Sequence, residues 1–365
     1  MQRQQIRNVA IRVCITGFYY GGLVAFARRR MRRQDRHLII LNYHRATDSD
    51  LRSHLRYLRR YYRLLPLDVA LAELYGCAND TRPLHDRRTP LVVTFDDGYY
   101  DNYTHAAALA KELQVPLTIF LIPAYVESGA RFWWYEGDCL VRDARVAAAT
   151  IQGRTYDLRL IEERQAASQA IYDFLYWAPS IAERETFLQK VRQALAIPAP
   201  DRMSDGPLRP LTWAEVREME ASGWITFGAH TLHHPVLAHL VDADEINREV
   251  VECRMVLDGH LLQRVRTFAY PFGRPEHIGN EGLHAVRDAG YDWAVTTLRG
   301  VNTAQTDPHL LRRIMVGTDR NWRELAADIA GVWPAFARAG RAILGSVGLG
   351  QPSSRSISYQ TRGDS

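Results

Sequence analysis

Two adjacent aspartates, Asp96 and Asp97, end an apolar run in the segment LVVTFDDGYY. Neighbouring side chains of a strand point to opposite faces, and a carboxylate buried without a partner is costly. At the last positions of a strand the chain leaves the extended geometry, and Gly98 permits a sharp exit, so both carboxylates could reach one site. A cation at the mouth of the sheet could neutralise one of them. The alternative is a capping role in a plain Asp-Gly turn.

Three histidines follow another apolar run, in the segment FGAHTLHHPVL. His230 and His234 are four residues apart, which would separate them by about 13 Å on an extended strand. Zinc holds each ligand nitrogen at about 2.1 Å, so these residues could bind one ion only if the chain turns through residues 231–233. A strand that ends at His230 allows such a turn. His233 is the competing ligand.

A third segment, FAYPFG at residues 268–273, runs from a strand into a turn that contains proline and glycine. Turns of this kind present backbone N–H groups, which can stabilise an oxyanion. All three segments fall at the ends of predicted strands. In α/β barrels such strand ends form the active face.

The elements that must position these residues alternate along the chain. Helical spacing, as at Leu55, Leu58 and Tyr62, follows the first strand-like run, and Thr212 is a predicted N-cap of a helix that Gly223 closes. This alternation predicts a parallel sheet or barrel with helices outside. The strand-like runs occupy residues 37–46, 90–95, 116–122, 224–231, 265–273, 291–297 and 309–316.

The alternation is interrupted from about residue 127 to residue 210. An aromatic segment, RFWWYEGDCLV, and a mostly helical stretch occupy this region, which we interpret as an inserted helical subdomain or cap. Three parts are therefore expected: a basic and apolar N-terminal segment at 1–36, a barrel with its insert at 37–330, and a C-terminal helix with a disordered tail at 331–365.

The composition indicates a globular protein with a sizeable core, since 47% of the 365 residues are apolar and 24% are charged. The net charge of +5 is modest, and outside the run ARRRMRR at residues 27–33 no basic stripe indicates nucleic-acid binding. The four cysteines lack CxxC spacing, so neither a thiolate zinc site nor a disulfide framework is predicted.

The apolar run at residues 13–27 is too short to span a membrane, because a spanning helix needs about 20 residues. Basic residues flank both of its ends, and no cleavage site of a signal peptide follows clearly. We expect a cytoplasmic or membrane-associated protein whose N-terminal segment is a candidate for peripheral contact with anionic lipid. A solvated basic flank is the alternative.

The chain resembles the polysaccharide deacetylases with a NodB-homology domain, carbohydrate esterase family 4, and in particular a long-chain branch of them. The family motif TFDDG is present at residues 94–98, and the motif His-Ser/Thr-x-x-His is present at residues 230–234. The proline-aromatic-glycine turn of the family corresponds to residues 271–273. The resemblance covers roughly residues 38–316 and is interrupted by the insert.

This resemblance implies a distorted (β/α) barrel of seven or eight strands that removes N-acetyl groups from hexosamine units. It also implies a divalent metal, most often Zn²⁺, held by Asp97, His230 and His234. Asp96 would be the general base that takes a proton from water, and the backbone N–H of Phe272 would stabilise the oxyanion. The products would be acetate and a free amine on the sugar.

The sequence departs from the family at two positions. Where the family commonly has an arginine that pairs with the catalytic aspartate, this chain has Ala269. We predict that Arg313 replaces it; Arg312 is the weaker candidate, and Arg266 has the wrong spacing. The family's late Leu-x-His motif is also not evident. Its histidine protonates the leaving amine, and our first candidate for that role is His44, for which a structural hydrogen bond is the alternative. His277 and His309 are lesser candidates.

We therefore predict a metal-dependent hydrolase of an N-acetylated glycan or glycan precursor. The predicted substrate-binding residues are Tyr270, Pro271, Phe272, Trp133 and Trp134. The two tryptophans could stack on sugar rings, or they could pack the insert against the barrel. One rival function is a deformylase or amidase that acts on a lipid-linked sugar. The other is a non-catalytic carbohydrate-binding protein with a degenerate site.

Overall fold

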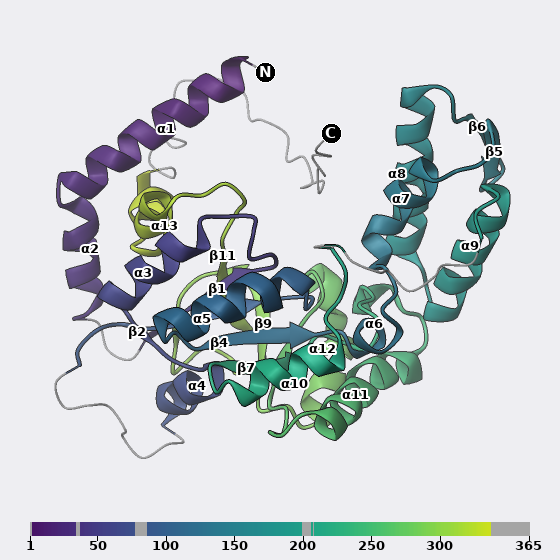
Figure 1. Ribbon diagram of the computed structural model, residues 1–365. Helices are drawn as coiled ribbons and strands as arrows, with labels where there is room; N and C mark the ends of the chain where they lie inside the picture. The colour runs from purple at the N-terminus through teal and green to yellow at the C-terminus, as the bar shows by residue number, and fades with distance from the viewer. Residues whose placement is uncertain (1, 34–36, 77–85, 199–205, 207, 337–365) are drawn as a thin grey trace. The chain divides into compact units, whose positions relative to one another are not determined.

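The computed structural model describes residues 2–33, 37–76, 86–198, 206 and 208–336. They belong to two compact units (Figure 1). One unit consists of the N-terminal residues up to Met31 and the residues from Arg323 onward, and the other extends from Arg32 to Trp322. The predicted tail after residue 336 lies outside the described residues.

A closed barrel of seven parallel strands forms the centre of the larger unit. The strands are β1 (His37–Tyr43), β3 (Pro90–Phe95), β4 (Leu117–Leu121), β7 (Ile225–Ala229), β8 (Thr267–Ala269), β9 (Trp293–Arg299) and β11 (Leu311–Met315). Their order around the barrel is β1, β11, β9, β8, β7, β4 and β3, and β3 pairs with β1 to close the ring. The predicted distorted (β/α) barrel is confirmed.

Two short strands outside the ring pair with barrel strands. The strand β2 (Arg63–Leu64) is parallel to β3, and β10 (Asn302–Thr303) is antiparallel to β1. The barrel strands are apolar almost without interruption because side chains fill the interior while helices cover the outside. All seven residues of β1, for example, are buried. This continuous burial explains why strands such as β1 are apolar runs in the sequence, whereas β11 contains two arginines.

Helices surround the barrel, and each buries one apolar face against it. In α3, Leu51, Leu55 and Leu58 are buried at helical spacing, whereas Arg52 and Arg56 are exposed. The surrounding elements are α3 (Leu51–Tyr61), α4 (Leu67–Tyr75), the π-helix η1 (Asn102–Ala107), α5 (Ala108–Leu113), α6 (Pro123–Ser128), α10 (Trp213–Ala221), the 3₁₀ helix η3 (Leu237–His239), α11 (Ala243–His260) and α12 (Pro275–Asp288).

The start of α10 confirms the predicted cap at Thr212. The Thr212 hydroxyl accepts a hydrogen bond from the N–H of Glu215, and the Glu215 carboxylate accepts one from the N–H of Thr212. This capping box satisfies two backbone donors that a helix leaves unpaired at its first turn. It therefore fixes where the chain returns from the insert to the barrel.

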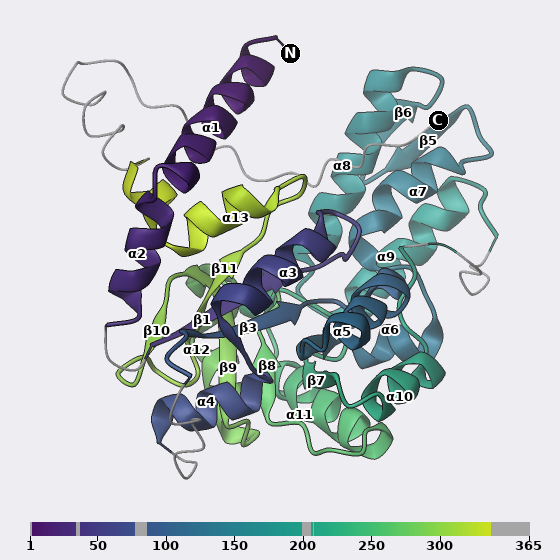
Figure 2. The same ribbon diagram turned by 60° about the vertical axis from the view of Figure 1, so that its left-hand side comes forward.

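The region between α6 and α10 packs around a hydrophobic core that also includes Tyr99, Ile122 and Tyr125, and both views show its helices together beside the barrel (Figures 1 and 2). It contains the 3₁₀ helix η2 (Trp133–Tyr135), α7 (Glu136–Arg142), α8 (Ile161–Trp177) and α9 (Ile181–Ala194). It also contains a hairpin of β5 (Ala148–Ile151) and β6 (Arg154–Asp157), which the sequence pattern did not predict. The insert is therefore a mixed structure, with helices as its largest part.

The smaller unit contains α1 (Gln2–Tyr20) and α2 (Leu23–Met31), together with most of α13 (Trp322–Ile329). Arg12 of α1 forms an ion pair with Glu324 of α13. Among the described residues, no helix has both the length and the apolar character needed to cross a bilayer.

Candidate active site

The residues that could bind a metal or transfer protons lie at the carboxyl ends of neighbouring barrel strands. The strand β4 lies between β3 and β7 and pairs with both in parallel. Asp96 and Asp97 directly follow β3, and His230 directly follows β7. The two segments therefore leave the barrel at the same edge, which is the edge where α/β barrels build their active sites.

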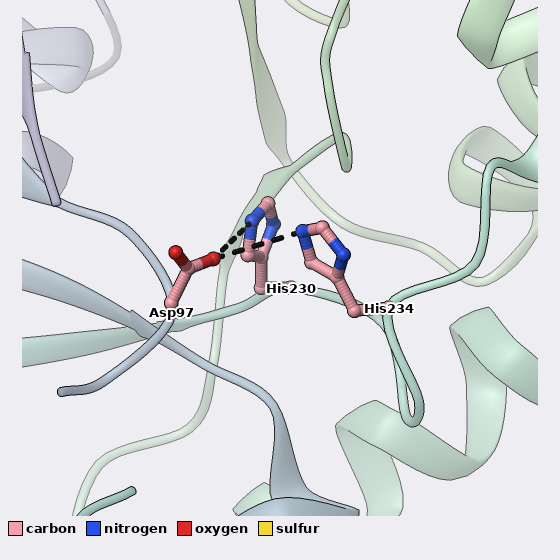
Figure 3. A group of neighbouring side chains, drawn as sticks. All are labelled: Asp97, His230 and His234. Carbon is pink, nitrogen blue, oxygen red and sulfur yellow. Dashed lines mark ion pairs between the residues drawn. The ribbon is translucent and has the colours of Figure 1, made fainter. Parts of the chain in front are cut away.

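Asp97, His230 and His234 form a buried cluster (Figure 3). The Asp97 Oδ1 atom lies 3.4 Å from His230 Nε2 and 3.6 Å from His234 Nε2, and one ligand atom of each residue lies within 4.8 Å of the others. Ligand atoms about 2.1 Å from a tetrahedral zinc ion are about 3.4 Å apart, so the spacing of this cluster fits such an ion.

The backbone at this cluster is held in an uncommon conformation. Asp97, Thr231 and His234 have φ values of 73°, 60° and 56°, and Phe272 beside them has 59°. These are four of the eight non-glycine residues with positive φ among the described residues. Such strain costs about 1–3 kcal/mol per residue and is concentrated at functional sites in proteins. At Thr231 and His234 it produces the turn that two ligands four residues apart require.

The hydrogen bond of His230 and the low pKa of His234 suit metal binding, whereas the pKa of His230 is raised, despite its burial, by the two carboxylates beside it. His230 donates from Nδ1 to the carbonyl oxygen of Ala269 at 2.6 Å, because a carbonyl can only accept, and this leaves Nε2 directed at Asp97. Burial alone would lower the pKa of His230, but Asp97 and Asp96 raise it. The pKa of His234 lies well below its usual value because of burial and the charge of His230. A neutral imidazole is the form that binds metals.

The competing ligand, His233, faces away from this cluster. Its Nδ1 lies 2.6 Å from Glu249 Oε1, and its backbone N–H donates to Glu249 Oε2 at 2.8 Å. Glu249 belongs to α11 and is buried, and its own carbonyl accepts the N–H of Leu232. Glu249 therefore fixes the loop between the two ligands through hydrogen bonds, one of which engages the ring of His233.

The insert holds the same loop from the other side. The indole N–H of Trp133 donates to the carbonyl of His234 at 2.9 Å, and Arg184 donates to the carbonyl of His233 at 2.9 Å. Both side chains are buried, and the guanidinium of Arg184 lies 5.8 Å from the centre of the Trp133 ring. The loop that carries His234 is therefore bonded to the insert through two consecutive carbonyls.

Asp96 is paired with Arg313 in the barrel interior. The guanidinium donates to both carboxylate oxygens, at 2.7 and 2.8 Å, and its side chain is fully buried. Burial alone would raise the pKa of Asp96, but the charge and hydrogen bonds of Arg313 and the charge of His230 lower it to about 2. Such bidentate pairs fix a carboxylate in both position and orientation.

The alternation of β11 separates the two candidate arginines. Arg313 points inward and donates through Nε to the carbonyl of Thr296 at 2.9 Å, whereas Arg312 is exposed. Arg266 pairs with Asp292 before β8, at the opposite edge of the barrel from Asp96. Ala269, at the family's usual arginine position, contributes its backbone carbonyl to His230 instead.

The turn after β8 places Phe272 at the cluster and directs Tyr270 away from it. The Phe272 ring centre lies 5.4 Å from that of His234, and no described residue accepts a hydrogen bond from the N–H of Phe272. Tyr270 is buried and packs on Phe268, in the layer between barrel and helices. The Tyr270 side chain is only 1% exposed and lies against Phe268, so the predicted contact with substrate does not fit this side chain. Pro271 is buried in the turn.

The three candidate general acids differ in position. His44 follows β1 and lies close to the site. Burial and nearer charges have the larger effects on the pKa of Asp96 and of His234, and a charge on His44 lowers both further. His277 packs on Phe272 and bonds the Tyr176 hydroxyl at 3.0 Å. His309 bonds the Tyr291 carbonyl, before β9 and hence at the far end of the barrel. This position excludes His309 as the general acid.

The two predicted sugar-binding tryptophans also differ. Trp133 is only 1% exposed, so for this residue the alternative, packing of the insert against the barrel, is the correct one. Trp134 is partly exposed and lies 4.6 Å from the His234 ring, and its indole N–H donates to the Tyr99 hydroxyl at 2.9 Å. Trp134 is therefore the better placed of the two to meet a substrate.

Comparison with known proteins identifies similar sequences and folds. Residues 85–294 match the family model described as polysaccharide deacetylase. Among solved structures, the deacetylase PplD of Streptococcus pyogenes in complex with acetate has a TM-score of 0.51 at 17% identity, covering 79% of this chain and 96% of that chain. The structure of IcaB from Ammonifex degensii has a TM-score of 0.51 at 20% identity, covering 80% and 97%.

A third similar structure is the deacetylase domain of BpsB from Bordetella bronchiseptica, with a TM-score of 0.50 at 14% identity over 79% of this chain and 98% of that one. At these identities the likeness concerns the fold. No curated protein matches the chain.

Proposed function

The chain belongs to the polysaccharide deacetylase family, whose members hydrolyse linear amide bonds other than peptide bonds, and we propose that it removes acetyl groups from N-acetylated hexosamine units of a glycan. The observation that carries this proposal is the convergence of two groups at one barrel edge. Asp97, His230 and His234 form a cluster that could hold a metal, and Asp96 lies beside it with its own arginine. These two groups could supply a Lewis acid that polarises the amide carbonyl and a base that activates water.

Asp97, His230 and His234 would hold a divalent metal, for which Zn²⁺ is our proposal. Two imidazoles and one carboxylate are a common zinc donor set, and catalytic sites with three protein ligands keep a further position open. A metal there would polarise the amide carbonyl and make water a stronger nucleophile. The bond from His230 Nδ1 to Ala269 orients one ligand ring, and Trp133 fixes the backbone of the other.

Asp96 would accept a proton from the attacking water. Its low pKa keeps the carboxylate ionised at neutral pH, and Arg313 holds both of its oxygens so that the group cannot rotate freely. A proton acceptor must lie within hydrogen-bond distance of the proton that it takes, so its orientation is as important as its pKa. Arg313 therefore acts as a positioning residue in this proposal.

Phe272 and His44 would complete the reaction. The N–H of Phe272 has no acceptor among the described residues, and its location beside His234 supports a role in stabilising the oxyanion. His44 would donate a proton to the leaving amine, because it stands at the end of β1 near Asp96. The partly exposed ring of Trp134 would contact the sugar.

The intact pair of Asp96 and Arg313 favours an enzyme over a binding protein with a degenerate site. Burying a carboxylate and a guanidinium carries a desolvation cost, and apolar residues could fill the same space without it. The pair is therefore better explained by a catalytic role than by stability. The test measures the acetate that the full chain releases from an oligomer of N-acetylglucosamine. The measurement is repeated after a chelator removes the metal and again after zinc is restored. Loss with chelation and recovery with zinc is expected. Release of formate from a formylated lipid-linked sugar, without acetate release, would favour the first rival instead.

We also propose that the smaller unit binds an anionic membrane surface peripherally. Val13 and Tyr20 share one face of α1, and they and Phe26 of α2 are 64–67% exposed. Arg29 and Arg30 are exposed at the end of α2. Exposed aromatic and apolar side chains next to arginines suit an interface of acyl chains and anionic headgroups.

Co-sedimentation of the full chain with vesicles tests this second proposal. Binding to vesicles that contain phosphatidylserine is expected, with weaker binding to pure phosphatidylcholine and a further loss as salt is raised. The double variant Arg29→Gln, Arg30→Gln should bind less to the anionic vesicles. Equal sedimentation with and without the anionic lipid contradicts the proposal.

A further inference from the structure

An aromatic pair at the end of α8 reaches the rim of the candidate active site. Tyr176 and Trp177 are the last two residues before the helix ends. The ring centre of Tyr176 lies 5.2 Å from that of Phe272, which itself lies 5.4 Å from His234. Trp177 lies 5.2 Å from Tyr176. These steps place the indole no more than about 16 Å from the His234 ring.

Trp177 is unusual because it is both exposed and held in place. Its side chain is 63% exposed, and it is the one tryptophan of the described residues that falls in the exposed class. One face of the indole is stacked on His239, at 4.1 Å between ring centres and 20° between planes. His239 in turn lies 2.9 Å, through Nδ1, from the carbonyl oxygen of Tyr176.

Tyr176 is fixed in a similar way. Its hydroxyl lies 3.0 Å from His277 Nε2, and its ring meets Phe272 edge to face. The insert thus places both aromatic rings against elements that follow the barrel strands, η3 and α12. A large apolar ring left in water is unfavourable, whereas a rigid ring that is already oriented loses little entropy when a ligand packs on it.

We infer that Tyr176 and Trp177 form a subsite that binds a sugar ring of a polymeric N-acetylhexosamine chain, beyond the unit that is deacetylated. This inference rests on the proposed function and extends it to the length of the substrate. The apolar face of a hexopyranose ring matches the exposed face of the indole, and the rings of Phe272 and Tyr176 connect Trp177 to His234 through edge-to-face and tilted contacts. The substrate is therefore a chain and not a single sugar.

The test compares short and long substrates. Acetate release is measured from the dimer and the hexamer of N-acetylglucosamine with the wild type, with Trp177→Ala and with Trp177→Tyr. Trp177→Ala should lower kcat/KM for the hexamer at least about fivefold and leave the value for the dimer within about twofold. Trp177→Tyr should restore most of the hexamer activity, because it keeps an aromatic face. Trp224→Ala, before β7 and thus at the opposite end of that strand from His230, is the control.

Binding is measured separately so that failure of the subsite is distinguished from failure of the proposed reaction. Calorimetric binding of the hexamer is compared for Asp96→Asn and for Asp96→Asn, Trp177→Ala, neither of which needs to turn over. A weaker Kd in the second variant supports the subsite even if the wild type releases no acetate. Equal losses on dimer and hexamer, unchanged hexamer binding, or no hexamer binding by Asp96→Asn would each overturn the inference.

Discussion

The indole N–H of Trp133 donates a hydrogen bond of 2.9 Å to the carbonyl oxygen of His234. Trp133 belongs to the insert and His234 to the loop after β7, so a subdomain outside the barrel holds the backbone of a proposed metal ligand. His234 has a positive φ of 56°, a conformation that persists only where the surroundings impose it. The insert is therefore part of the candidate active site.

Replacing Trp133 by phenylalanine should weaken metal binding. The variant keeps a ring in the buried position but loses the donor to His234, and partners that orient a metal ligand are typically worth about 10–100-fold in affinity. Because this partner acts on the backbone, we expect the lower end of that range. The measurement is the zinc Kd from competition with a chromophoric chelator. Trp134→Phe, which loses a donor to Tyr99 instead, is the control, and equal affinities in the two variants contradict the prediction.

Removing His234 should abolish metal binding, whereas removing His233 should not. His234 points its Nε2 at Asp97, and the ring of His233 is occupied by Glu249. Elemental analysis of His234→Ala and His233→Ala, purified in the same way, measures bound metal per chain. Full occupancy in His234→Ala would transfer the assignment to His233.

Asp96→Asn should retain the metal and lose turnover. Asparagine has nearly the same shape but cannot accept a proton from water, and loss of a general base typically costs about 10²–10⁴-fold in rate. The expected result is an unchanged metal content with kcat reduced in this range. A variant with near-normal kcat shows that another residue is the base.

The barrel was predictable because its signal is local and strong. Most of the strands are apolar runs, and Asp96 and His230 stand where two such runs end, so their shared edge follows from parallel pairing alone. Glu249 is also marked in the sequence, because it occupies the buried face of α11 with Ile246 and Val250, where an unpaired charge is costly. A charged residue on an apolar helix face indicates a polar partner.

Other features depend on contacts between distant segments, which periodicity does not contain. Arg184 reaches the carbonyl of His233 across 49 positions, and nothing in its own helix distinguishes it from other arginines. The turn that contains Tyr270 predicts a contact with substrate, but the side chain is buried and packs on Phe268. The hairpin of β5 and β6 is short, and both of its faces contain polar residues.

The buried His54 should make the protein less stable below neutral pH. Burial lowers the pKa of His54, which lies between the Tyr43 hydroxyl and the Arg320 carbonyl. A depressed pKa means that the folded chain remains unprotonated while the unfolded chain takes up a proton near pH 6.5. The stability contributed by His54 is therefore present above that pH and is lost as the pH falls, by at most about 1.4 kcal/mol per pH unit.

Denaturant unfolding at pH 7.5 and 5.5, with chelator present throughout, checks this prediction. His54→Gln should show a smaller difference in unfolding free energy between the two pH values than the wild type. The exposed His284→Gln controls for the loss of one histidine. An unchanged difference in His54→Gln would assign the pH dependence to other groups.

The pair of Asp96 and Arg313 should be energetically coupled, and Arg312 should be irrelevant to it. Arg313→Ala leaves the Asp96 carboxylate buried without its cation, so the unfolding free energy should fall by about 3–5 kcal/mol. Arg312 is exposed on the other face of β11, and Arg312→Ala should change stability by no more than about 0.5 kcal/mol. The double variant Asp96→Asn, Arg313→Ala should be destabilised by less than the sum of the two single changes, because neither charge remains. Additive effects in this cycle, or a larger loss in Arg312→Ala, would show that the pairing does not position Asp96.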